Sequence, residues 1–225
     1  MNTEEDYKIY NGAYIYSNVS IGDNVTIFPG AVIGRPPLSS GATQRQKDSR
    51  KLLPVIIGDN CVIGSNAVIY NDVELGENTM VCDTACIREG VRIGHHSLIA
   101  MGVTVNYDTT IGNNVRIMDN THITGNMIIE DNVFIGMLVT TANDNKMGRL
   151  SDEERNKKEW ITRGPTIKKF TTIGQGACIL PGIVIGENCI VGTNSVVTKD
   201  LKKEGLYVGI PAKRLRDLKL EEQMK

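Results

Sequence analysis

A six-residue unit repeats along most of the chain and constrains its fold more than any other feature. Written in sixes from Ile9, the chain reads IYNGAY, IYSNVS, IGDNVT, and similar units resume at Ile57 and at Ile167. The three runs hold 25 hexads, each opened by an aliphatic residue and usually with a small or β-branched residue in fifth place. Such a long series in one phase predicts a repetitive scaffold.

The period decides which scaffold is possible. A β-strand rises about 3.3 Å per residue, so six residues supply one short strand and a bend. Three units would close a triangular coil, with the first and fifth positions pointing inward and stacking on their equivalents in the next coil. Gly and Asn in the bends tolerate conformations that other residues avoid. We therefore predict an all-β parallel β-helix, a solenoid whose ends need capping.

Two breaks and two ends complete the predicted organisation. Residues 1–8 form an N-terminal segment, and residues 9–200 form the solenoid. Loops interrupt it at 34–56 and 141–166, and long excursions from a regular scaffold are usually functional or disordered. Residues 201–225 predict a turn containing Pro211 and a C-terminal α-helix, with Leu215 and Leu218 capping the open end of the solenoid.

Composition excludes several classes of partner. The net charge of −1 gives no electrostatic footprint for nucleic acid or an anionic membrane. No stretch approaches the ~18 consecutive apolar residues of a membrane span, and the acidic start MNTEEDYKIY is unlike a signal peptide. Five cysteines without a CxxC motif fit a reducing compartment. We expect a cytoplasmic protein with no membrane span and no nucleic-acid partner.

One histidine stands where chemistry is plausible. His122 fills the sixth place of its hexad, so it should point outward, in a column with Cys86, Thr104 and Thr140. The second loop leaves the scaffold directly after Thr140, on a face that another subunit could cover. A lone histidine is ordinarily a solvated surface residue, and the sequence leaves both interpretations open.

Other candidate groups are weaker. His95 and His96 lie in the turn of IGHHSL, more than one coil from His122, and only His96 is kept as a substrate-binding candidate. A metal site needs three or four converging ligands. Cys86 shares the column of His122, but no third ligand is near, so no metal is expected. Arg35 belongs to a basic first loop that suits a diphosphate or is simply solvated.

The hexads resemble the hexapeptide-repeat acyltransferase family over roughly residues 9–200. That resemblance implies a left-handed parallel β-helix, whereas parallel crossovers are otherwise right-handed. The segment VRIMDNTHITGNMIIEDNVFIGMLVTTANDN is similar to nucleotide-sugar N-acetyltransferases, which acylate an amino group of a deoxysugar. It implies acceptor contacts at Asn120, Asn143 and Asp144. Asp119 stands where an asparagine pair is usual, and Ala142 stands where threonine is common.

The C-terminal part is similar to the donor-binding end of acyl-CoA-dependent members. The similarity covers RGPTIKKFTTIGQGACILPGIVIGENCIVGTNSVVTKD and then YVGIPAKRL. In those members the pantetheine arm runs along the solenoid between subunits of a homotrimer, bonded to backbone amides near small residues. The matching positions are Gly176, Ala177, Thr193, Ser195 and Val196, with Lys199, Lys213 and Arg214 suited to the phosphates of coenzyme A. For AKRLR a solvated helix start is the alternative.

The chemistry implied by the resemblance needs few side chains. An amine attacks a thioester, so the enzyme must align the reactants and offer the oxyanion a donor. A histidine near neutral pH can take the amine proton, although a neutral amine is already nucleophilic. The candidate catalytic residues are His122, Asn120 and Asp119. The candidate substrate-binding residues are Asn143, Asp144, Thr140, Arg35 and His96.

We expect an N-acyltransferase that moves an acetyl or short acyl group from acyl-CoA to a nucleotide-linked deoxyamino sugar. Its place would be in the synthesis of surface glycans such as lipopolysaccharide. Two alternatives are kept. One is a sugar or serine O-acetyltransferase in which His122 is an obligatory base, and the other is a non-catalytic β-helix scaffold.

Overall fold

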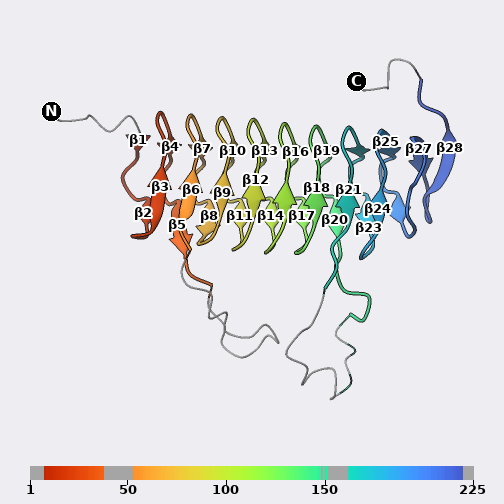
Figure 1. Cartoon of the computed structure of the whole chain (residues 1–225), viewed down its shortest axis with the longest axis horizontal. Helices are drawn as coiled ribbons and strands as arrows, with labels where there is room; N and C mark the ends of the chain where they lie inside the picture. Colours follow the sequence, from red (N-terminus) through yellow and green to blue (C-terminus); the bar gives the residue numbers. More distant parts are fainter. Residues whose placement is uncertain (1–7, 38–52, 148, 150, 152–161, 220–225) are drawn as a thin grey trace.

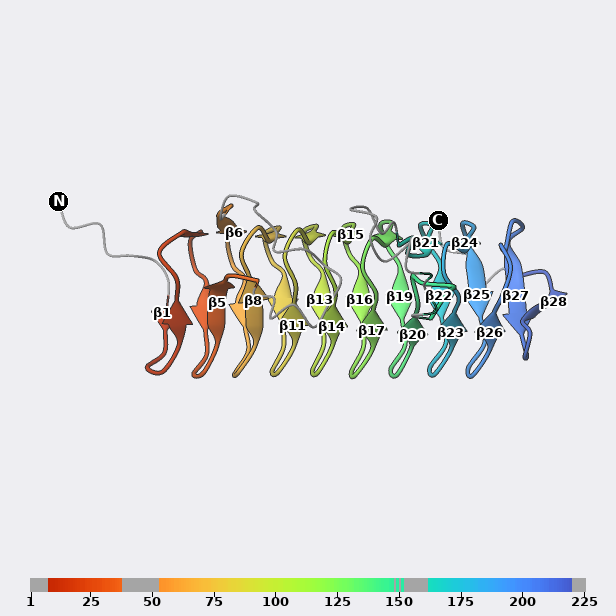
Figure 2. The same cartoon turned by 90° about the horizontal axis from the view of Figure 1, so that it is seen from below.

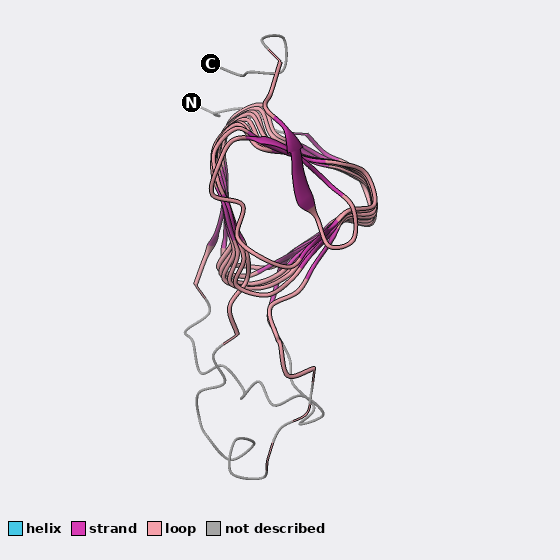
Figure 3. Ribbon diagram, turned by 90° about the vertical axis from the view of Figure 1, so that its right-hand side faces the viewer, coloured by secondary structure: helices cyan, strands magenta, loops and turns pink. Residues whose placement is uncertain are grey.

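The chain winds into a solenoid with a triangular cross-section, seen from the side in Figure 1 and down its axis in Figure 3. The computed structural model describes residues 8–37, 53–147, 149, 151 and 162–219. Each coil gives one short strand to each of three sheets, here called A, B and C. The prediction of a left-handed parallel β-helix is confirmed.

The three sheets run the length of the solenoid (Figure 2). Sheet A contains β1 (Lys8–Ile9), β4 (Thr26–Ile27), β7 (Val62–Ile63), β10 (Met80–Val81), β13 (Leu98–Ile99), β16 (Arg116–Ile117), β19 (Phe134–Ile135), β22 (Thr172–Ile173), β25 (Cys189–Val191), β27 (Gly205–Val208) and β28 (Lys213–Arg216). Sheet B contains β2 (Tyr14–Ile15), β5 (Val32–Arg35), β8 (Val68–Tyr70), β11 (Cys86–Ile87), β14 (Thr104–Val105), β17 (His122–Ile123), β20 (Thr140–Thr141), β23 (Cys178–Ile179) and β26 (Val196–Val197). Sheet C contains β3 (Val19–Ile21), β6 (Val55–Ile57), β9 (Glu74–Leu75), β12 (Arg92–Ile93), β15 (Thr110–Ile111), β18 (Ile128–Ile129), β21 (Thr166–Ile167) and β24 (Val184–Ile185).

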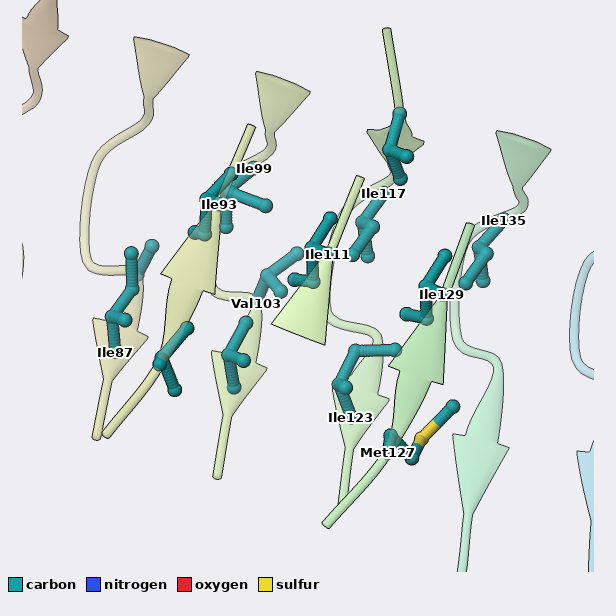
Figure 4. Packing of buried hydrophobic residues seen from close by; sticks show 14 of the residues in the cluster. Ile87, Ile93, Ile99, Val103, Ile111, Ile117, Ile123, Met127, Ile129 and Ile135 are labelled. Atoms are coloured by element: carbon teal, nitrogen blue, oxygen red, sulfur yellow. The ribbon is translucent and has the colours of Figure 1, made fainter. Parts of the chain in front are cut away.

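The core is a stack of aliphatic side chains inside the triangle. The first residue of each hexad points inward, and Ile87, Ile99 and Ile123 are fully buried (Figure 4). The fifth position also points inward, as the buried Val103 shows. Each side chain of this size contributes about 1.5–3 kcal/mol on burial. The predicted inward positions are therefore confirmed.

Several inward positions carry a hydroxyl, and each of these is satisfied within the solenoid. At five of these positions the hydroxyl donates to a backbone carbonyl 15 residues further on, which follows the rule that buried polar groups are hydrogen-bonded. The pairs are Thr79–Gly94, Ser97–Gly112, Thr109–Thr124, Thr121–Gly136 and Thr171–Gly186.

The bends between sheets have a common construction. Most carry a residue in the left-handed conformation, such as Asn60 with a φ of 58° and Asn120 with a φ of 55°. Asparagine tolerates this region better than most residues. We call the bends after sheet A, sheet B and sheet C the AB, BC and CA corners.

The predicted C-terminal α-helix is wrong within the described residues 201–219. β27 continues sheet A, the chain turns at Pro211, and β28 pairs with β27 in antiparallel direction. Side-chain exposure alternates along Lys213–Arg216, which is a strand pattern. β28 thus pairs with the edge of β27 that would otherwise have no partner strand. The remainder of the predicted helix, residues 220–225, lies outside the described residues.

Of the two leucines predicted to cap the solenoid, Leu218 is buried, whereas Leu215 is 63% exposed.

The described part of the chain contains no helix with the length and hydropathy of a membrane span.

Both loops leave from the BC corner, on the same side of the solenoid (Figures 1 and 3). The first follows β5 and the second follows β20. Sheet B runs β5-β8-β11-β14-β17-β20, so the two roots are five coils apart. At a strand spacing of about 4.8 Å, this is about 24 Å along the axis.

Candidate functional site

His122 begins β17 on the outer face of sheet B, next to the root of the second loop. It pairs with Thr104 on one side and with Thr140 on the other, so the predicted column is confirmed. Its ring is half-buried, and its Nδ1 lies 2.7 Å from the Thr104 hydroxyl oxygen. When Nδ1 carries the proton and donates to Thr104, Nε2 is left as an acceptor for a substrate proton.

The environment of His122 suits a base. Burial lowers the pKa of its imidazole below the ordinary value, because the charged form is desolvated. The ring is therefore neutral at neutral pH and can take a proton.

Thr141 fixes the backbone of His122, and sequence reasoning missed it. Thr141 is 6% exposed and points inward, where neighbouring coils of sheet B carry Ile or Val. Its hydroxyl donates to the His122 carbonyl over 3.0 Å and accepts from the Thr124 amide over 2.8 Å. The sequence signal that could have revealed this role is a threonine at the first position of a hexad, where the other hexads have an aliphatic residue.

Asp119 and Asn120 form the AB corner immediately before β17. Asp119 Oδ1 accepts from the Met101 amide over 3.2 Å, one coil earlier. The side chain of Asn120 lies over Gly102, where an added Cβ would meet Asn120 Oδ1 at 2.4 Å. Equivalent contacts recur at other corners, for example between Asn194 and Gly176. Both predicted catalytic residues therefore have an architectural role.

Asn143 and Asp144 form the outgoing stem of the second loop. Asn143 Nδ2 donates to the Gly125 carbonyl over 3.1 Å, and its own carbonyl accepts from the Arg163 amide of the returning stem. Asp144 Oδ1 accepts from the Lys146 amide over 2.7 Å. Thr140 is exposed beside His122. Of these three residues, Thr140 pairs directly with His122, and Asn143 and Asp144 follow it in the outgoing stem.

The returning stem is held as closely as the outgoing one. Asn126 Nδ2 donates to the Thr162 hydroxyl over 2.7 Å. A Cβ on Gly164 would lie 2.7 Å from the carbonyl oxygens of Gly125 and Asn126, so only glycine fits there. The second loop thus enters and leaves next to β17.

His96 lies apart from His122, at the CA corner. Its φ is 56°, and its Nδ1 is 2.9 Å from that of His95. It borders a groove of about 720 Å³. The other lining residues are Asn78, Asn114, Arg116, Asn132, Val133 and Phe134. The structure therefore does not bring His96 and His122 together within one chain. Among the described residues, no three His, Cys, Asp or Glu side chains gather as metal ligands.

Arg35 lies at the root of the first loop, away from His122. Its guanidinium is 5.2 Å from the centre of the Tyr70 ring, and that of Arg88 is 4.8 Å from the same ring. Arg88 forms a bidentate pair with the buried carboxylate of Glu89. Burial opposes the charge on Arg88, but its hydrogen bonds to Glu89 raise its pKa overall.

The predicted coenzyme A positions divide into two groups. Ala177 and Ser195 are fully buried, and their amides donate to Gly174 and Gly192. Neither can offer its side chain or amide to a ligand without disrupting the solenoid. The amides of Gly176 and Val196 are likewise bonded within the chain. Thr193 is exposed and remains a candidate.

The basic candidates at this end also differ from one another. Arg214 donates twice to the Glu204 carbonyl and pairs with Asp217, which raises the pKa of the guanidinium. Lys199 and Lys213 are exposed, and neither has an ion pair within the described part of the chain. The two lysines are therefore better placed than Arg214 for an incoming phosphate.

A family model for the bacterial transferase hexapeptide (six repeats) matches residues 2–35, 54–88, 108–143 and 164–199. These segments make up more than half of the chain. The protein belongs to this hexapeptide family. The repeats seen in the family model are the coils of sheets A, B and C, and they include β17 and the root of the second loop.

Curated relatives of this hexapeptide protein match over short segments. A putative acetyltransferase from Schizosaccharomyces pombe is 47% identical over 49 residues, 22% of this chain and 24% of the relative. Serine acetyltransferase from Buchnera aphidicola is 42% identical over 57 residues, 25% of this chain and 22% of the relative. The chain therefore spans about a quarter of the length of the curated relatives it matches.

Two solved structures of acyltransferases match parts of this chain. AntD, an N-acyltransferase from Bacillus cereus in complex with dTDP-4-amino-4,6-dideoxyglucose and coenzyme A, is 25% identical with a TM-score of 0.46. The match covers 76% of this chain and 86% of AntD. A maltose O-acetyltransferase from Clostridium difficile is 25% identical with a TM-score of 0.38, over 60% of this chain and 67% of that one.

Proposed function

We propose that the protein is an acyl-CoA-dependent N-acyltransferase. It transfers an acetyl or short acyl group to the amino group of a nucleotide-linked deoxyamino sugar for surface-glycan synthesis, as a cytoplasmic homotrimer. Membership of the hexapeptide family and relatives named acetyltransferase support acyl transfer. The observation that carries the proposal is His122, half-buried, bonded to Thr104 and placed beside the root of a loop.

In the proposed reaction, the amine nitrogen attacks the thioester carbon while His122 Nε2 accepts the amine proton. The tetrahedral intermediate then collapses, the carbon–sulfur bond breaks, and coenzyme A leaves as a thiolate that takes up a proton. Alignment of amine and thioester supplies much of the rate. Asn143, Asp144 and Thr140 would bind the acceptor, while Thr193, Lys199 and Lys213 would bind coenzyme A.

The test is release of coenzyme A thiol from acetyl-CoA with a panel of amino sugars, nucleotide-linked amino sugars, simple sugars and serine. We expect release only with a nucleotide-linked amino sugar. His122→Asn should then lower kcat, by 10² or more if the histidine is a general base and by less than tenfold if it only orients the acceptor. Circular dichroism would show that the variant is folded.

The second candidate is a sugar or serine O-acetyltransferase, which the similarity to a serine acetyltransferase favours. A hydroxyl is a poorer nucleophile than a neutral amine, so His122 would be obligatory. Thiol release with simple sugars or serine, lost in His122→Asn, would support this candidate. Absence of both thiol release and coenzyme A binding would instead support a scaffold.

A further inference from the structure

A bulge in sheet B brings Arg35 onto Tyr70. The register between β5 and β8 shifts between Ile33 and Arg35, so that Arg35 pairs with Tyr70. Gly34 makes the shift with a φ of +85°, and a Cβ on it would lie 2.9 Å from Tyr16 Cβ. Bulges re-aim side chains and are common beside functional sites. A glycine is therefore used here to turn an arginine over an aromatic ring.

Arg88 approaches the same ring from the next coil, which makes a compact cationic cluster of Arg35, Tyr70 and Arg88. Glu89, whose side chain is 3% exposed, neutralises one of the two guanidinium groups. Arg35 is exposed, and within the described residues it has no carboxylate partner. The cluster and Glu89 together carry one uncompensated positive charge on an arginine held by a ring. Arginine in this setting suits a phosphate, which it can bind with two parallel hydrogen bonds.

The position of the cluster relates it to His122. Sheet B runs β5-β8-β11-β14-β17, so Arg88, directly after β11, lies two coils from His122, Tyr70 on β8 three coils and Arg35 on β5 four coils. At about 4.8 Å per coil, these are about 10, 14 and 19 Å along the axis. In a nucleotide-linked amino sugar the hexose ring comes between the amine and the diphosphate, so an acceptor with its amine at His122 and extended along sheet B toward the first loop would point its phosphates toward the cluster.

We propose that the cluster of Arg35, Tyr70 and Arg88 binds the diphosphate of the acceptor, an inference that rests on the proposed function. The acceptor lies along sheet B with its amine at His122 and its phosphates toward the first loop. The phosphates of coenzyme A have the same chemistry, so the test must separate the two sources. We assign the cluster to the acceptor because coenzyme A has its predicted contacts at the C-terminal end of the solenoid.

The experiment is isothermal titration calorimetry of the full chain with UDP, dTDP and coenzyme A as separate probes. The main variant is Arg35→Met, and the matched control is Lys8→Met, an exposed cation held 4.5 Å from the centre of the Tyr10 ring on sheet A. We expect Arg35→Met to weaken UDP or dTDP binding about tenfold or more, the loss typical of a hydrogen bond to a charged group. Binding of coenzyme A, and all binding by the control, should be unchanged.

Arg88 needs a paired substitution, because its removal alone would leave Glu89 buried without a partner. Arg88→Met with Glu89→Gln removes both charges, and this double variant should also weaken nucleoside diphosphate binding. Unchanged UDP and dTDP affinity in Arg35→Met would overturn the proposal, as would absence of binding by the wild type or a loss confined to coenzyme A.

The proposed acyltransferase function and the proposed phosphate site can fail independently of each other. If Arg35→Met loses nucleoside diphosphate binding while the wild type transfers no acyl group to any acceptor, the cluster remains a phosphate site and the acyltransferase proposal falls. If the wild type acylates amino sugars that lack a phosphate and Arg35→Met does so equally well, the phosphate site is wrong and the acyltransferase stands.

Discussion

Thr141 couples the solenoid to the position of His122. The ladder between β17 and β20 has one paired position, at His122 and Thr140, whereas β20 pairs with β23 at both of its residues. The Thr141 hydroxyl supplies hydrogen bonds to the His122 carbonyl and from the Thr124 amide. A side chain thus substitutes for backbone pairing at the point where the loop departs, and it holds the candidate base.

Replacing this hydroxyl should therefore cost both stability and activity. Thr141→Val keeps the side-chain shape but leaves the Thr124 amide buried without its partner, at about 1–3 kcal/mol. We expect urea denaturation to report a loss of this size, together with a lower kcat. Thr141→Ser should restore both. A Val variant as stable as the wild type would contradict this prediction, because it would mean that the Thr124 amide finds another hydrogen-bond partner.

The depressed pKa of His122 predicts a pH dependence for catalysis. Since burial lowers this pKa in the folded protein, the neutral base is present above a midpoint that lies below 6.5, the usual histidine value. kcat/KM should fall as the pH drops through that midpoint, and His122→Asn should remove this acid limb. A limb centred above 6.5, or one retained in the variant, would contradict the assignment.

Folding stability should change in the same direction. The unfolded chain binds a proton to His122 more readily than the folded chain does, so stability falls as the pH drops from 6.5 through the folded pKa. Urea midpoints at several pH values, compared between the wild type and His122→Asn, isolate this contribution from those of other groups.

At the residue scale, sequence reasoning predicted the column of Cys86, Thr104, His122 and Thr140 because the hexad phase fixes which side chains share a face. It could not predict the contact of Arg35 with Tyr70, since a one-residue bulge changes the register locally. It also assigned chemistry to Asp119 and Asn120, whose corner roles become visible only when successive coils are stacked.

At the scale of an element, a corner depends on one residue in the left-handed conformation. Asn120→Gly should keep the AB corner, because glycine adopts a positive φ without penalty, whereas Asn120→Ala should cost about 1–2 kcal/mol. If Asn120 is purely architectural, the Gly variant keeps kcat within threefold while the Ala variant is less stable. A hundredfold loss of kcat in a folded Gly variant would instead give Asn120 a catalytic role. Thermal melts and thiol release measure the two effects.

The strands were predictable because 25 hexads share one pattern, while the C-terminal segment occurs once. Leucines spaced along residues 215–220 suggested an amphipathic helix. β27 pairs with β25 on one side, and its other edge would be unpaired without β28. A strand is favoured there because pairing with β28 satisfies backbone groups that a helix would leave exposed. Tertiary context thus overrode local spacing where repetition no longer supported the prediction.

At the scale of the molecule, apolar side chains gather along the AB corner. Met101 is 50% exposed and Leu138 is 54% exposed, with Met137 beside it. Leu138 also has a φ of 58° at a position where most other coils use Asn or Gly and one uses Thr84. Strain of this kind persists only where the surroundings support it. A partner copy covering this corner would account for both the exposure and the leucine.

Leu138→Asn tests this arrangement directly. Asparagine suits the backbone conformation but removes the apolar contact, so the single chain should stay folded while its self-association weakens. Light scattering of the wild type should give three times the chain mass of 24.7 kDa, and the variant should give a smaller value. A monomeric wild type would refute the trimer, and an unaffected trimer would show that Leu138 is outside its interface.

Every coil adds the same rise along the axis, so the number of coils between two residues on one side of the solenoid sets their axial separation. Arg35 and His122 are on different coils, and removing or adding one complete coil between them would change their separation by about 4.8 Å. Neither group would need to change. A scaffold of this type can therefore match acceptors of different length by gaining or losing complete coils, whereas most folds would need several coordinated substitutions in a pocket.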